Sequence, residues 1–148
     1  MSYQERQVFV SIISSVVINV IYSLITLQRY PEASPYSVEI FHFWGSFFVV
    51  LILVTIVAKI IIYIIFAIVN AIATREEKPP ITDERDKLIE LKSTKTGLYV
   101  FALGFVLAMV SLVFNMPPTG MFLILYAGGF ASDIASDIAQ FVFYRRGF

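Results

Sequence analysis

The chain has 148 residues, of which 58% are hydrophobic and 16% aromatic, and its 11 basic and 11 acidic residues give a formal net charge of zero. This composition is too apolar for an ordinary soluble domain of this length, and the balanced charge argues against a nucleic-acid partner. The absence of cysteine excludes disulfides, thiolate metal sites and thiol nucleophiles.

The apolar residues gather in four continuous runs, at about 8–27, 41–70, 97–114 and 121–143. Each run is close to the roughly 20 apolar residues that a helix needs to cross a bilayer. Continuous runs, rather than alternating ones, also exclude a membrane β-barrel. The sequence therefore predicts an all-α fold, in which residues 1–148 form one polytopic four-helix transmembrane bundle with lipid around it. The first run lacks a signal-peptide cleavage pattern, so it is expected to be retained as a helix.

The basic residues predict the orientation of these helices. With both termini inside, Arg6, the six basic residues of the 75–95 loop, Arg145 and Arg146 are cytoplasmic, and Arg29 alone is outside. Because cytoplasmic loops are enriched in Lys and Arg, this distribution predicts that both termini and the 75–95 loop are cytoplasmic.

The second helix is longer than a bilayer requires. Residues 39–74 would extend about 54 Å as one helix, against roughly 30 Å of hydrocarbon. Its last turns are therefore expected to protrude into the cytoplasm, where residues 71–96 form the segment between helices two and three.

A second helix start is predicted inside this segment, where Thr82 or Asp83 can cap and acidic residues precede basic ones. Ile81, Leu88 and Leu91 form an apolar stripe that is expected to pack on the protruding end of helix two. The charged residues predict either a solvated surface or a docking site for another protein, comprising Asp83, Arg85, Asp86, Lys87 and Glu90.

The most informative motif is Ser132-Asp133-Ile134-Ala135-Ser136-Asp137-Ile138-Ala139, which places two carboxylates inside the fourth apolar run. Residues four apart share a helix face, so Asp133 and Asp137 point the same way. Ionisable groups at membrane depth rarely face lipid, and they mark a partner, a pathway or a packed interface.

Lys59 in helix two is the predicted partner of these acids. Counted from the outer ends of their helices, Lys59 and Asp137 lie at similar depth, which predicts a Lys59–Asp137 pair or a lysine between both acids. A lysine that instead reaches the cytoplasmic headgroups is the alternative. Two carboxylates with one cation leave one acid to bind a proton, a monovalent cation or an amine, or to stay protonated in a structural hydrogen bond. Supporting polar residues on helices one, two and four are Asn19, Thr55, Tyr63, Ser132, Ser136 and Gln140.

Catalytic motifs are absent from the sequence. The single histidine, His42, is distant in depth from the acids, and the chain has no HExxH motif, phosphate loop or nucleophile elbow. The protein is therefore predicted to be non-enzymatic, with neither a cofactor nor a metal site.

Three stretches resemble a family of small four-helix bacterial membrane proteins of unknown function. They are the run Asp83-Glu-Arg-Asp-Lys-Leu-Ile-Glu-Leu-Lys92 with Tyr99-Val-Phe101, the terminal Tyr144-Arg-Arg-Gly-Phe148, and Phe43-Trp-Gly-Ser46. The resemblance implies the four-helix topology and a location in a prokaryotic cytoplasmic membrane, and no particular activity.

Two functions are expected from these observations. The first is a regulatory, accessory or immunity-type membrane protein that acts through contacts with a cytoplasmic or membrane protein. The second is a homo-oligomeric, proton- or cation-coupled small transporter that uses Asp133, Asp137 and Lys59. A homodimer through helix four is the expected self-association.

Overall fold

The computed structural model describes residues 2–74 and 83–146, and all regular secondary structure in these ranges is helical. The helices are α1 (Tyr3–Leu27), α2 (Val38–Thr74), α3 (Glu84–Val113) and α4 (Pro118–Arg146). Each is long and apolar enough to cross a membrane. The predicted all-α fold with four such helices is confirmed.

The helix ends follow from local sequence. Ser2 and Glu5 form a capping box at the start of α1, and Asp83 and Asp86 form another at the start of α3. Between α3 and α4, Asn115 adopts a positive φ of 57°, a conformation that asparagine tolerates better than most residues. α4 then begins at Pro118, three residues before the predicted span, because a proline fits the first turn of a helix.

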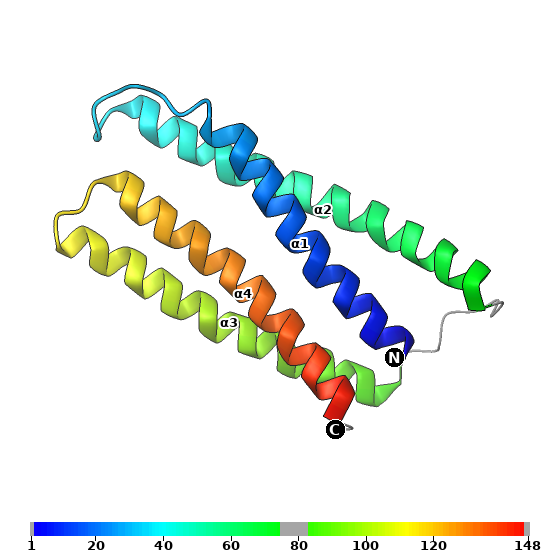
Figure 1. The fold of residues 1–148 in the computed structure, drawn as a ribbon. Helices are drawn as coiled ribbons and strands as arrows, with labels where there is room; N and C mark the ends of the chain where they lie inside the picture. Colours follow the sequence, from blue (N-terminus) through cyan, green and yellow to red (C-terminus); the bar gives the residue numbers. More distant parts are fainter. Residues whose placement is uncertain (1, 75–82, 147–148) are drawn as a thin grey trace.

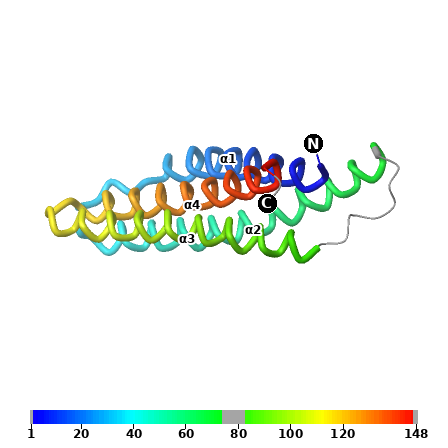
Figure 2. The backbone as a smooth tube through the Cα atoms, turned by 90° about the horizontal axis from the view of Figure 1, so that it is seen from below, coloured from blue at the N-terminus to red at the C-terminus, as the bar shows by residue number. Residues whose placement is uncertain are grey.

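Figure 1 shows how the four helices are arranged. α3 and α4 form a hairpin packed along its length, and α1 lies across α4 and α2. Both termini and the start of α3 lie at the same end of the molecule, which we call the terminal end (Figures 1 and 2). α4 is therefore the helix that touches all three others.

The predicted packing of helix two on a separate 83–92 helix is wrong. Residues 84–113 form one continuous helix, and over their described lengths α2 and α3 make no contact. Leu88 and Leu91 are 54% and 67% exposed, whereas Ile89 is fully buried. Ile89 lies on the same face of α3 as the buried residues Ser93 and Gly97. This face makes the helix contact, and the face with Leu88 and Leu91 does not. Ile81 lies outside the described residues.

Small residues hold α3 and α4 together. A Cβ added at Gly104 would lie 2.8 Å from the Cα of Gly128, and Ser132 donates a 2.7 Å hydrogen bond to the carbonyl of Gly97. Such close approach with a hydroxyl bond between helices is typical of helices packed in membranes. The Gly128-x-x-x-Ser132-x-x-x-Ser136 ridge in the sequence thus forms the α3–α4 contact.

At the end opposite the termini, α2 is held by aromatic packing. Ile40, Trp44 and Phe47 are buried there. The ring of Trp44 stacks on Phe122 with centroids 5.6 Å apart, and Tyr22 donates to the carbonyl of Phe47 at 2.8 Å. This cluster fixes the first part of α2 against α1 and α4, and Lys59 and Tyr63 lie further along α2.

Candidate functional site

Two serines of α1 face the two aspartates of α4. Ser15 Oγ donates to Asp133 Oδ2 and Ser11 Oγ donates to Asp137 Oδ2, both at 2.7 Å. The helices run antiparallel, so the four-residue spacing of the serines matches that of the aspartates turn for turn. The common face predicted for the two acids is the α1–α4 contact.

α2 contributes one residue to each pair. Lys59 Nζ lies 3.2 Å from Asp133 Oδ2 and 3.3 Å from Oδ1, and Tyr63 Oη donates to Ser11 Oγ at 3.1 Å. Lys59 and Tyr63 are again four residues apart. We call Lys59–Asp133–Ser15 the lysine layer and Tyr63–Ser11–Asp137 the tyrosine layer.

The expectation that at least one aspartate lies within salt-bridge reach of Lys59 is confirmed, but the partner is Asp133 rather than Asp137. Side chains in a helix lean toward its N-terminus, and the lysine stem is longer than that of aspartate. The amino group of Lys59 therefore lies nearer the outer end of α2 than its Cα does. A count of residues from the outer ends of the helices compares the depths of the Cα atoms, but not those of the amino and carboxylate groups.

The two aspartates have different surroundings. Asp133 has a cation in direct contact, with side-chain exposures of 20% for Lys59 and 40% for Asp133. Asp137 is hydrogen-bonded by Ser11, a neutral hydroxyl, which in turn is bonded by the neutral hydroxyl of Tyr63. Among the described residues no basic group is in salt-bridge contact with Asp137, and the nearby Lys59, one turn away, is bonded to Asp133.

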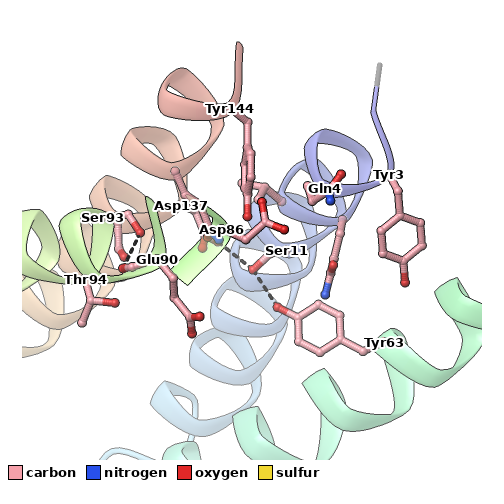
Figure 3. Close-up of a pocket in the computed structure, with 14 residues that line it drawn as sticks. Tyr3, Gln4, Ser11, Tyr63, Asp86, Glu90, Ser93, Thr94, Asp137 and Tyr144 are labelled. Carbon is pink, nitrogen blue, oxygen red and sulfur yellow. Dashed lines mark hydrogen bonds between the residues drawn. The ribbon is translucent and has the colours of Figure 1, made fainter. Parts of the chain in front are cut away.

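Asp137 also lines a cavity of about 400 Å³, which we call the acidic cavity (Figure 3). All four helices contribute to it, and none of the described residues in its lining is basic. The lining comprises three carboxylates, three tyrosines, three glutamines, four hydroxyl residues and one valine: Asp86, Glu90, Asp137, Tyr3, Tyr63, Tyr144, Gln4, Gln7, Gln140, Ser11, Ser93, Thr94, Ser136 and Val8. This wall is polar and acidic, with aromatic faces among the acids.

The acids are spread around this wall and do not form a compact cluster. Asp86 and Glu90 come from α3, whereas Asp137 comes from α4 (Figure 3). Among the described residues, no group of three or more His, Cys, Asp or Glu side chains is placed to hold a metal ion. The chemistry that this arrangement offers is the binding of a proton or of a cation large enough to meet several wall groups.

The predicted site residues divide into four groups. Lys59, Asp133, Asp137 and Tyr63 form the two layers, and Ser136 and Gln140 line the acidic cavity. Ser132 serves the α3–α4 contact. Asn19 donates to the carbonyl of Ser15 in its own helix, and Thr55 is half-buried on α2.

The predicted docking residues of the 83–92 segment also lie in different surroundings. Asp83 caps α3, and Arg85 and Lys87 are exposed. Asp86 and Glu90 line the acidic cavity. Two acids expected on an outer surface thus belong to the same cavity wall as Asp137.

Several residues of the cavity wall are not among the site residues predicted from the sequence. Tyr3, Gln4 and Gln7 precede the first apolar run, and Tyr144 follows the last one. The sequence does contain a pattern that predicts the serine partners of the aspartates. Ser11 and Ser15 have the same four-residue spacing as the aspartates, and they lie on a helix that must run antiparallel to α4.

In comparisons with protein-family models, curated proteins and solved structures, nothing matched the chain. The resemblance to small four-helix bacterial membrane proteins stays a prediction.

Proposed function

We propose that the protein is a polytopic membrane protein with four spanning helices, both termini cytoplasmic, and the terminal end of the molecule on the cytoplasmic side. The length and apolar character of all four helices support the membrane location. The orientation rests on the basic residues at the termini and in the 75–95 loop, against Arg29 on the other side.

In this membrane protein, the acidic cavity binds a monovalent cation, and Asp137 is the carboxylate that the cation or a proton neutralises. The observation that carries this proposal is the neutral hydroxyl partner of Asp137, in a cavity whose described lining has no basic residue. A negative charge at membrane depth is costly without a counter-charge. A cation that enters from the cytoplasmic side supplies that charge.

Asp133 has a different role in this scheme. Lys59 already neutralises it, and Ser15 bonds the same oxygen that Lys59 approaches most closely. The lysine layer is therefore a fixed link between α1, α2 and α4, and the tyrosine layer one turn away carries the exchangeable charge. This division favours a small proton- or cation-coupled transporter.

Calorimetric titration of the protein in lipid nanodiscs with tetramethylammonium tests the proposal. Wild-type protein should bind the cation, and Asp137→Asn should weaken binding at least tenfold, because the variant removes the charge that the cation meets. Glu84→Gln is the matched control, since it removes an exposed carboxylate that does not line the cavity. Equal binding by Asp137→Asn and wild-type protein would contradict the proposal.

A second candidate function is supported by the exposed start of α3. Leu88 and Leu91 are exposed beside the charged Arg85 and Lys87, at the terminal end of the molecule. A mixed apolar and charged surface outside the membrane suits contact with a cytoplasmic protein. A photo-crosslinker at Leu91 should then capture a protein in intact cells, with Val57 in α2 as the lipid-facing control; capture of lipid alone at both positions would contradict it.

A further inference from the structure

A groove of about 380 Å³ lies beside the acidic cavity. α3 contributes one wall of this groove and α4 contributes its floor, which includes Gly129 and Asp133. Thr94 and Ser136 line both the groove and the acidic cavity. The two spaces therefore adjoin at these two residues.

The groove is open because α2 and α3 make no contact over their described lengths. The space around two neighbouring glycines of α4 shows which side of this helix is packed and which side is open. A Cβ at Gly128 would lie 3.0 Å from the Cα of Gly104, whereas one at Gly129 would meet nothing within 4 Å. Gly128 thus makes the helix contact, and Gly129 leaves free space in the groove.

The wall of the groove is more apolar than that of the cavity. Leu98 and Phe101 of α3 line it and are 60% and 40% exposed. Polar groups lie on the floor, at Ser132 and Asp133. A ligand in the groove would therefore meet apolar side chains along α3 and would bury surface that is otherwise exposed.

The spacing along α4 relates the groove to Asp137. Asp133 and Gly129 lie one and two turns before Asp137, or about 6 and 12 Å along the helix axis. A cation held at Asp137 can therefore extend a short apolar substituent past Ser136 toward Gly129.

We propose that the acidic cavity and the groove form one binding site for an amphipathic organic cation. Its charged group lies at Asp137, with the aromatic faces of Tyr63 and Tyr144 in the same wall. Its apolar substituent lies along Gly129, Leu98 and Phe101. This inference rests on the proposed function and adds the class of ligand. The carboxylates of the acidic cavity, Asp86, Glu90 and Asp137, disfavour a phospholipid, whose phosphate they would repel.

Two cations with the same charged group test the inference: tetramethylammonium and hexyltrimethylammonium, titrated into protein in lipid nanodiscs with empty nanodiscs as the blank. In wild-type protein the hexyl chain should improve Kd about tenfold or more, because burial of several methylene groups is favourable. Gly129→Leu should reduce this gain to less than about twofold and leave tetramethylammonium binding unchanged, since the leucine fills the groove only.

Gly45→Leu is the matched control, because a Cβ at Gly45 in α2 also meets nothing within 4 Å and Gly45 lines neither space. It should retain the full gain. Phe101→Ala is a second variant, which opens the groove without filling it and should reduce the gain about threefold.

The possible results separate the two proposals. If wild-type protein binds neither cation, the proposed function fails and this inference fails with it. If tetramethylammonium binds but the hexyl chain adds nothing, or if Gly129→Leu retains the gain, the groove is not part of the site. Disulfide dimers formed by Gly129→Cys in the membrane would show that a second copy covers the groove, which also overturns the inference.

Discussion

Ser11 and Asp137 are 126 positions apart in the chain, and Ser11 Oγ donates to Asp137 Oδ2 at 2.7 Å. Ser11 is also the acceptor for Tyr63, so one serine hydroxyl joins α1, α2 and α4. The equivalent position one turn further along, Ser15, joins the same helices through Asp133 and Lys59. These two serines are among the points at which side-chain hydrogen bonds join the α1–α2 pair to the α3–α4 hairpin; the others include Tyr126 with the carbonyl of Asn19 and Tyr30 with Thr119.

Loss of the lysine alone should be worse than loss of the whole ion pair. Lys59→Met leaves the partly buried Asp133 charged with only the hydroxyl of Ser15 in contact, so we expect a loss of about 1–3 kcal/mol in the free energy of unfolding. Lys59→Met with Asp133→Asn should lose less, because no charge is stranded. Unfolding in detergent gives both values, with exposed Lys87→Met as the neutral control. A double variant no more stable than the single one would show that the pair does not couple.

Ser11→Ala should destabilise the protein through two lost hydrogen bonds. The variant leaves Asp137 without its donor and Tyr63 without its acceptor, which we expect to cost about 1–3 kcal/mol. Ser14→Ala is the control, because Ser14 is also buried but donates to a carbonyl of its own helix. The same unfolding measurement compares them; equal losses would argue against a special role for the tyrosine layer.

Gly104→Ala should separate α3 from α4. The added Cβ would lie 2.8 Å from the Cα of Gly128, and backbone can yield only by moving a helix. Overpacking of this kind costs about 1–3 kcal/mol. Gly45→Ala, which meets nothing within 4 Å, should be close to neutral in thermal unfolding. If Gly104→Ala is equally neutral, the two helices are not held at this distance.

The proposed orientation predicts the outcome of cysteine labelling. Because the chain has no cysteine, single-cysteine variants need no background correction. A membrane-impermeant reagent added to intact cells should label Ser34→Cys and should label Glu84→Cys only after the cells are opened. The reverse pattern would place the acidic cavity on the outer side.

Periodicity predicted the helices and the common face of the two aspartates, because both depend on spacing within one segment. The partner of Lys59 was placed one turn away, since the direction of a long side chain decides which acid it meets. The error at Leu88 and Leu91 has a similar origin. Ile89 continues the buried line of Ser93 and Gly97 along α3. The stripe was predicted from apolar residues alone, whereas the face of α3 that packs in the structure also contains small residues.

The acidic cavity could not be predicted because its wall comes from all four helices. Asp86 and Glu90 have the sequence context of solvated helix residues, and only the way α3 lies on α4 turns them toward Asp137. The open groove depends on the missing contact between α2 and α3, which is a property of tertiary packing.

The lysine layer also has a consequence for biogenesis. The most apolar stretch of α4 is less apolar than those of the other three helices, and α4 contains both aspartates. An aspartate at the centre of a helix opposes membrane insertion by about 2.5–3.5 kcal/mol. Ser11, Ser15 and Lys59 are synthesised before α4, so a chain inserted in sequence order already contains the partners of both acids when α4 emerges. In the proposed topology, stable insertion of the last helix then depends on the first two, and loss of Lys59 should leave the C-terminus on the outer side of the membrane in part of the newly made protein.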